Sequence, residues 1–312
     1  MSGLLDRSLL FVTGKGGVGK TTVAAGLALH AARQGKRTLV CEVDAKGTLA
    51  DLFSLERLTF EPREVQNNLF AMTMDTEASL KEYLALQLRM PLMARIGPLA
   101  RVFEFVATAA PGVKEVLTVG KAVYEVREKR WDLVIVDAAA TGHIVGQLGA
   151  PQAINELVHV GLISQQTGWM VEILSDTATT GAVIVTTPEE MPVNETIDLA
   201  GRLQDETSVE LAAVVVNRVL PELFGRGEEE VFEAMRSDEA PLAKAVGPSV
   251  HAVLEAAELA VSLRRARAEH LDHLIESIDS TLPMLFVPYL FTKAHGVRST
   301  RLVADALGAE LG

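Results

Sequence analysis

The chain has 312 residues, of which 48% are hydrophobic, and it carries a formal net charge of −12. This composition supports a large folded core and excludes an intrinsically disordered chain. The negative charge disfavours nonspecific binding to nucleic acid or to anionic lipid. The single cysteine, Cys41, cannot form an internal disulfide, and we expect it to be a small buried core residue.

No segment of the chain predicts secretion or a membrane span. The first ten residues, MSGLLDRSLL, lack the basic start and the apolar core of a signal peptide. The most apolar stretch, residues 90–112, is interrupted by prolines and charges. We therefore expect a cytoplasmic protein.

A phosphate-binding loop is predicted at residues 14–22, GKGGVGKTT, between an apolar run and a helical pattern. Its glycines allow successive backbone N–H groups to surround a phosphate, and the helix N-terminus adds partial positive charge. We expect Lys20 to reach the β- and γ-phosphates of ATP and the Thr21 hydroxyl to hold Mg²⁺. The nucleotide-binding residues predicted in this loop are Gly14, Gly16, Gly17, Val18, Gly19, Lys20, Thr21 and Thr22.

A second buried strand is predicted over residues 37–43, and it delivers Asp44 to the edge of the sheet where the phosphate lies. There Asp44 could orient or activate the attacking water. Residues 69–75 predict a third short strand. From residue 76 to about 130 the pattern is helical and too long for one crossover helix, so we predict a helical subdomain inserted in the sheet.

The clearest central strand is predicted over residues 131–136 and is followed by Asp137. An aspartate after an apolar strand is the Walker B arrangement, in which the carboxylate holds Mg²⁺ through its water shell. The magnesium residues predicted in this chain are thus Thr21, Asp44 and Asp137. Gly142 would let the backbone approach the γ-phosphate and change conformation.

The remaining elements complete an α/β pattern. Helices are predicted over residues 151–178, 249–278 and 300–311, and buried strands over 182–186, 211–216 and 284–287. In the helix 249–278, His270 and His273 have a spacing that could bind a metal ion. Because no cluster of further ligands accompanies them, we expect them on a solvated face of the helix. We predict one P-loop domain, 1–312, with a doubly wound, mainly parallel sheet, and a helical subdomain from about 76–130 and 143–178.

A second lysine, Lys15, gives the loop the form K-G-G-x-G-K-[ST]. This form resembles the deviant Walker A motif of the ATPases that include ArsA, the tail-anchored-protein-targeting ATPases, MinD, ParA and nitrogenase iron protein. Residues 44–51 resemble switch I of that family, with Lys46 and Ala50 as departures, and 137–143 resemble switch II of the ArsA and tail-anchored-protein-targeting branch. Shorter resemblances to this branch lie at 111–115, at Pro188-Glu189 and at Glu195-Thr196.

The resemblance implies Mg²⁺-dependent ATP hydrolysis by a dimer, in which Lys15 of each subunit reaches the nucleotide of the other. It implies Lys15, Lys20 and Asp44 as catalytic residues. It also implies that Asn217 reads the adenine edge. Lys15 could instead be a solvated loop lysine, and Asn217 a strand-end turn residue. The apolar floor under the adenine would be Pro288, Tyr289 and Leu290.

The partner implied is a second copy of this chain or a paralogous subunit. In the tail-anchored-protein-targeting branch the helical subdomain binds an apolar client helix, so a hydrophobic client or a membrane-associated partner is expected here. An alternative is that the apolar residues of this region form the core of the subdomain itself. They are Met90, Leu92, Met93, Ile96, Leu99, Phe103, Phe105, Leu162, Ile163, Trp169 and Met170.

Two further functions remain alternatives: a nucleotide-sensing module with little turnover, and a spatial regulator similar to MinD or ParA. The acidic net charge and the C-terminal helix without a basic face disfavour the second. The zinc-binding Cys-x-x-Cys and the arsenite-binding cysteines of related ATPases are missing from this sequence. We therefore expect ATP and Mg²⁺, but neither zinc, arsenite nor nucleic acid.

Overall fold

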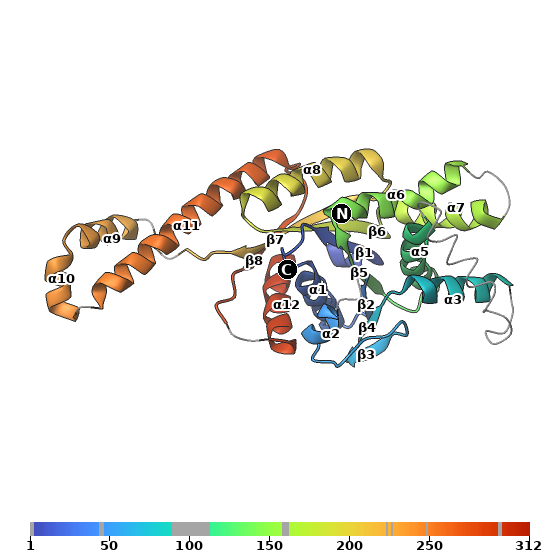
Figure 1. Ribbon diagram of the computed structural model, residues 1–312, viewed down its shortest axis with the longest axis horizontal. Helices are drawn as coiled ribbons and strands as arrows, with labels where there is room; N and C mark the ends of the chain where they lie inside the picture. Colours follow the sequence, from blue (N-terminus) through green and yellow to red (C-terminus); the bar gives the residue numbers. More distant parts are fainter. Residues whose placement is uncertain are drawn as a thin grey trace.

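The computed structural model describes residues 3–43, 47–88, 113–157, 162–222, 224–225, 227–247, 249–292 and 295–312. The described part contains an eight-stranded sheet with the strand order β3-β4-β2-β5-β1-β6-β7-β8 (Figure 1). Neighbouring strands run parallel except β3, which pairs antiparallel with β4. This confirms the predicted mainly parallel α/β fold. The strands are β1 (Leu9–Gly14), β2 (Thr38–Glu42), β3 (Arg63–Gln66), β4 (Leu69–Thr73), β5 (Leu133–Ala140), β6 (Thr180–Thr186), β7 (Leu211–Val219) and β8 (Met284–Pro288).

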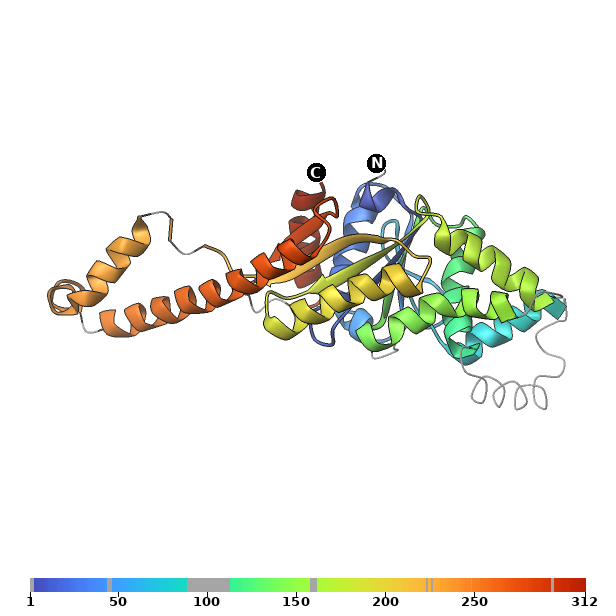
Figure 2. The same ribbon diagram turned by 90° about the horizontal axis from the view of Figure 1, so that it is seen from above.

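Helices cover both faces of the sheet (Figures 1 and 2). The central strands β1 and β6 are buried along their whole length, which is why they consist of near-continuous apolar residues. Alternate strand residues contribute to two separate cores, one on each face. The first core packs against α1 (Lys20–Arg33), α2 (Thr48–Leu52) and α12 (Val297–Leu311), and the second against α5 (Val113–Arg127), α6 (Thr141–Leu157) and α8 (Glu190–Glu206).

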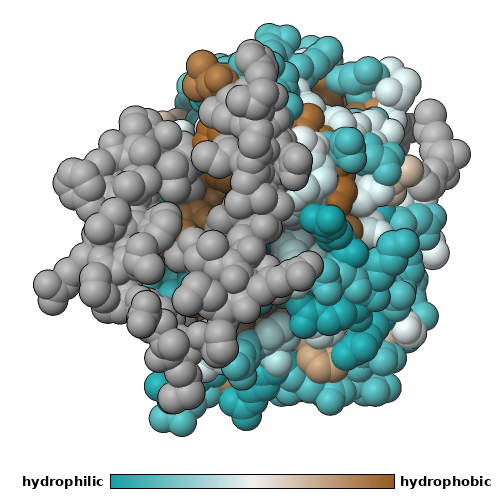
Figure 3. All heavy atoms as spheres, turned by 90° about the vertical axis from the view of Figure 1, so that its right-hand side faces the viewer, coloured by the Kyte–Doolittle hydropathy of each residue, from teal (hydrophilic) through white to brown (hydrophobic). Residues whose placement is uncertain are grey.

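Four helices gather at one end of the sheet, on the right of Figure 1. Here α5 packs against α6 and against two further helices, α3 (Thr76–Leu88) and α7 (Leu162–Ser175). Helix α6 begins at Thr141, directly after the end of β5. This start is ten residues before the predicted helical stretch, which begins at 151. Figure 3 shows apolar patches among hydrophilic surface on this end of the molecule.

Two of the residues predicted to line a client groove can be located. Met170 is 5% exposed, and Trp169 is partly buried, with the Arg127 guanidinium 4.6 Å from the centroid of its indole ring. Both side chains therefore pack within the helical group, as the core alternative expects. Residues 90–105 lie outside the described residues, as do the side chains of Leu162 and Ile163.

A helical arm projects from the opposite end of the sheet, beyond β7 and β8 (Figures 1 and 2). It consists of α9 (Glu228–Ser237), α10 (Glu239–Val246) and the first part of α11 (Val250–Ser277). The other end of α11 packs on the sheet, where Leu274 shares a small core with residues of α8 and β7. The sequence pattern predicts α11, but it does not predict that α11 leaves the sheet.

Other details differ from the pattern-based prediction. The edge strand β3 is polar and half-exposed, so it has no apolar periodicity from which it could be predicted. Strand β5 continues four residues beyond 136, because the small residues Ala138 and Ala139 are buried and the Thr13 hydroxyl donates to the Ala139 carbonyl at 2.9 Å. The short 3-10 helix η1 (Leu4–Asp6) precedes β1. None of the described helices is both long and apolar enough to cross a membrane.

Candidate functional site

The glycine-rich loop joins the carboxyl end of β1 to the first turn of α1. Gly14, Gly17 and Gly19 have φ angles of 139°, 90° and 97°, which favour glycine. A Cβ at Gly14 would lie 2.1 Å from the Val185 carbonyl oxygen of β6, so the loop also approaches the neighbouring strand closely. Gly16 and Gly17 are exposed, whereas Val18 is 2% exposed and anchors the loop in the core. The loop thus has a fixed base and an open, glycine-lined upper surface.

The two lysines of the loop have partners within the chain. Lys20 begins α1, and its Nζ donates to the Lys15 carbonyl oxygen at 3.1 Å, so its side chain folds back across the loop. Thr21 and Thr22 follow in the first turn of α1, both partly exposed. This first turn begins where the loop ends, which is the arrangement expected for a phosphate site.

Thr21, in the first turn of α1, contacts Asp137, which lies within β5 three residues before its end. The Thr21 hydroxyl donates to Asp137 Oδ2 at 2.6 Å, and Asp137 is only 7% exposed. Asp137 is in register with Val12 on one side and with Glu42 on the other. A hydroxyl and a carboxylate at the end of a phosphate-binding loop are the protein ligands that Mg²⁺ takes beside nucleotide phosphates and water. These residues therefore fit the ion.

Asp44 and Gly142 were also predicted to lie near the phosphates. Asp44 lies outside the described residues, which resume at Gly47, just before α2. Gly142 is exposed in the first turn of α6, and a Cβ there would meet no atom within 4 Å. The segment that resembles switch II is therefore the last part of β5 followed directly by α6, with no loop between them.

Lys15 is bound within its own chain. Its Nζ forms an ion pair with Glu195 Oε1 of α8, and Glu195 Oε2 accepts a hydrogen bond from the Thr141 hydroxyl at 3.2 Å. The Lys15 and Glu195 side chains are 26% and 35% exposed. Glu195 thus connects the glycine-rich loop to the start of α6. Sequence reasoning singled out Glu195 by resemblance only, because nothing in the local pattern shows that α8 lies beside Lys15.

Asn217 lies behind the loop, near the end of β7. It is 7% exposed, and its Nδ2 donates to the Val18 carbonyl oxygen at 2.8 Å. Its Oδ1 accepts the Arg218 backbone N–H at 2.9 Å, and Arg218 has a φ of 60°. Asn217 therefore supports the base of the loop and also forms the kind of strand-end contact that the turn alternative expects.

The residues predicted under the adenine follow β8, the strand beside β7. Pro288 ends β8, and the Tyr289 backbone N–H donates to the Val219 carbonyl oxygen at 2.8 Å. The Tyr289 ring is 41% exposed and lies 4.8 Å, centroid to centroid, from the ring of Phe291. Leu290 is partly buried against the first core. An exposed aromatic pair thus lies on the chain that leaves β8, the neighbour of the strand that carries Asn217.

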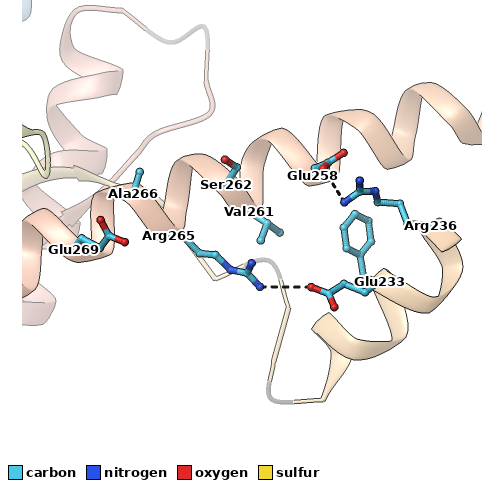
Figure 4. Close-up of a pocket in the computed structure, with 9 residues that line it drawn as sticks. Glu233, Arg236, Glu258, Val261, Ser262, Arg265, Ala266 and Glu269 are labelled. Carbon is cyan, nitrogen blue, oxygen red and sulfur yellow. Dashed lines mark ion pairs between the residues drawn. The ribbon is translucent and has the colours of Figure 1, made fainter.

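A separate cavity of about 430 Å³ lies on the arm, between α9 and α11. Figure 4 shows two ion pairs across it, Arg236 with Glu258 and Arg265 with Glu233. Their N–O distances are 2.7 Å and 3.9 Å. None of the predicted nucleotide residues lines this cavity. Within the part of the chain that the structure describes, no three His, Cys, Asp or Glu side chains cluster as a metal site.

Comparison with known proteins identifies the family. A family model described as Anion-transporting ATPase matches residues 7–168 and 162–249. ATPase BagA of Mycobacterium tuberculosis (strain ATCC 25618 / H37Rv) is 32% identical over 224 residues, which cover 68% of this chain and 65% of that protein. ATPase GET3 of Podospora anserina is 32% identical over 174 residues, 54% of this chain and 51% of that protein. The chain thus spans less than two thirds of the length of these relatives. It belongs to the ArsA family of anion-transporting ATPases.

Proposed function

We propose that this protein is a Mg²⁺-dependent ATPase that dimerises around nucleotide. The observation that carries the proposal is the contact between Thr21 and Asp137 beneath an open glycine-rich loop. In this arrangement the loop N–H groups and Lys20 bind the β- and γ-phosphates, and the hydroxyl and the carboxylate hold the ion. Bound Mg²⁺ neutralises the charge that develops on the phosphates during transfer.

Other residues orient the attacking water and bind the nucleoside. Asp44, which follows β2, orients the attacking water. Asn217 and the segment 288–290 bind the adenine from the ends of β7 and β8. The contact of Asn217 with the base of the loop, where its Nδ2 donates to the Val18 carbonyl oxygen, supports this assignment.

The second subunit supplies Lys15 to the nucleotide of the first. In the single chain Lys15 is paired with Glu195, and the partial exposure of both side chains supports an exchange of this pair for a phosphate contact at low cost. The subunit is a copy of this chain or a paralogous one. The chain forms one P-loop domain with the four-helix group, about 76–130 and 143–178, mounted on it as a subdomain.

Hydrolysis in the cytoplasm is coupled to binding or release of a hydrophobic client or of a protein partner. The packing of α5 and α6 on β5 supports this coupling, because α6 begins four residues after Asp137 and contacts α5 and α7 of the helical group. A movement of this segment on hydrolysis would be transmitted directly to the helical group.

Steady-state ATP hydrolysis with Mg²⁺ tests the proposal. We expect wild-type turnover, and its loss in Lys15→Ala and in Asp44→Asn; removal of a charge that completes a phosphoryl-transfer site costs roughly 10³–10⁵-fold. Lys81→Ala is the matched control, because Lys81 pairs with Glu77 on the exposed surface of α3. ATP binding without wild-type turnover would instead support the nucleotide-sensing alternative.

The dimer and the client need separate measurements. With ATP and Mg²⁺, Asp44→Asn should have twice the mass of one chain by light scattering, whereas the doubly substituted Lys15→Ala, Asp44→Asn protein should not. A fluorescent peptide with the sequence of a transmembrane helix should bind the ATP-loaded Asp44→Asn dimer. A monomer under these conditions contradicts the dimer, and a peptide that stays unbound contradicts the hydrophobic client.

A further inference from the structure

Glu42 is a buried carboxylate beside the candidate magnesium residues, and the sequence analysis did not single it out. It is the last residue of β2, it is 2% exposed, and it lies in register with Asp137 of β5. Residues two positions earlier on these strands, Val40 and Ile135, belong to the core beneath α1. Since side chains alternate along a strand, Glu42 and Asp137 point to this same face, on strands about 4.8 Å apart.

The two carboxylate oxygens of Glu42 have different surroundings. Oε1 accepts the backbone N–H groups of Thr48 at 3.0 Å and Leu49 at 3.3 Å, at the start of α2. Oε2 is buried and has no hydrogen-bond partner within the described residues. Among these residues no lysine or arginine forms an ion pair with Glu42 either. A buried carboxylate oxygen without a partner is unfavourable unless something binds it.

We propose that Glu42 is a further carboxylate of the magnesium site, whose Oε2 accepts a hydrogen bond from a water in the coordination shell of the ion. This inference rests on the proposed function. Mg²⁺ keeps several of its waters when it binds proteins, and those waters require acceptors. Asp137 supplies acceptors on one side of the site, and Glu42 supplies the next one along the sheet edge.

The same side chain connects the ion to α2. Because Oε1 holds the first two amides of α2, a water held by Oε2 fixes the carboxylate and, through it, the start of this helix. Helix α2 begins at Thr48, four positions after the proposed catalytic Asp44 in sequence. Glu42 is therefore a positioning residue, through which occupation of the metal site fixes the start of α2.

The substitution Glu42→Gln separates these two roles. Its amide oxygen can still accept from Thr48 and Leu49, but its NH₂ group cannot accept a hydrogen bond from a metal-bound water. The midpoint of thermal unfolding is measured with saturating ADP while MgCl₂ is titrated from an EDTA baseline. We expect the Mg²⁺ concentration at half-maximal stabilisation to rise roughly 10–100-fold in Glu42→Gln, as for other residues that support metal ligands from outside the coordination shell.

Hydrogen exchange of residues 47–53 provides a readout independent of affinity. Mg²⁺ with ADP should slow exchange of this segment in the wild type, and should have little effect in Glu42→Gln even at saturating Mg²⁺. Glu125→Gln is the matched control, because Glu125 is equally buried but is held by Lys121, Arg130 and Trp131 at the opposite face of the sheet. It should lower stability without moving the Mg²⁺ midpoint.

The outcomes distinguish the inference from the proposed function. A wild type that responds to Mg²⁺ and ADP, together with a Glu42→Gln midpoint within twofold of it, would overturn the role of Glu42 alone. A wild type that shows no response to Mg²⁺ and ADP would overturn the proposed function and the inference together. If Glu42→Gln fails to fold, Glu42→Asp, which shortens the side chain and keeps the charge, should still raise the midpoint.

Discussion

Replacing Gly14 by alanine should destabilise the protein far more than the same replacement at Gly16 or Gly17. At Gly14 the new Cβ would lie 2.1 Å from the Val185 carbonyl oxygen, and φ is 139°. Real Cβ atoms do not approach closer than 3.0 Å, so β1 and β6 would have to separate locally. Overpacking of this kind costs about 1–3 kcal/mol and a left-handed backbone about 1–2 kcal/mol, so we expect a loss of about 2–5 kcal/mol.

The two neighbouring glycines are internal controls for this estimate. Gly17 has a φ of 90°, but a Cβ added there would meet no atom within 4 Å, so Gly17→Ala should cost only the backbone term of about 1–2 kcal/mol. Gly16 has neither a positive φ nor a close neighbour. Gly16→Ala should be neutral, or stabilising by up to about 1 kcal/mol, because alanine restricts the unfolded chain.

Urea unfolding followed by circular dichroism, without nucleotide, gives the free energy of unfolding for all three variants. The expected order of stability is Gly16→Ala, then Gly17→Ala, then Gly14→Ala. Equal losses at Gly14 and Gly17 would refute the close approach of the loop to β6. A loss at Gly16 as large as that at Gly17 would refute the backbone conformation of the loop.

Three further predictions concern the core, the pH dependence and the base of the loop. Burial raises the pKa of Cys41, so its thiol should react with a disulfide reagent only after unfolding, and rapid labelling of the native protein would contradict its burial. Partial burial, and then the charge of Arg33, lower the pKa of His30 below 6.5, so the unfolded chain binds more protons and stability should fall as pH drops below 6.5. The free energy of unfolding, measured with urea between pH 5 and 8, should change less steeply with pH in His30→Gln than in the wild type, by at most about 1.4 kcal/mol per pH unit. An unchanged slope would contradict this effect of His30. Asn217→Ala should lower the free energy of unfolding in urea by about 1–3 kcal/mol, because it leaves the Val18 carbonyl oxygen without its donor. A loss smaller than the experimental error would show that Asn217 does not stabilise the base of the loop.

Some features of the chain depend only on neighbours in sequence, and the residues themselves predict these. The glycine-rich loop, with positive φ at Gly14, Gly17 and Gly19, and the helix after it follow from glycine and lysine patterns over a few residues. Asp137 was predicted to follow a strand ending at 136, because an apolar run precedes it. In the structure β5 continues to Ala140, and Asp137 lies within it and accepts a hydrogen bond from Thr21. The burial of Cys41 was predicted from the same kind of run and is confirmed.

Residues whose surroundings come from distant elements were not predicted. Glu195 meets Lys15 across 180 positions in sequence, and only the packing of α8 beside β1 brings them together. Glu42 looks like the end of an ordinary strand until the register of β2 with β5 sets it beside Asp137. The strand β3 depends on pairing with β4, because its own residues are polar and half-exposed.

The sequence by itself determined the fold class and the glycine-rich loop, because apolar periodicity and short glycine motifs are local properties of the chain. The resemblance of its motifs to those of known ATPases indicated the family. The tertiary structure alone decided which distant side chains lie beside the loop, such as Glu195 and Asp137. Ion pairs and hydrogen bonds between distant segments depend on strand order, register and helix packing, which are set by the core as a whole. The projection of α11 as an arm has the same origin, since its amphipathic pattern does not specify the surface against which it packs.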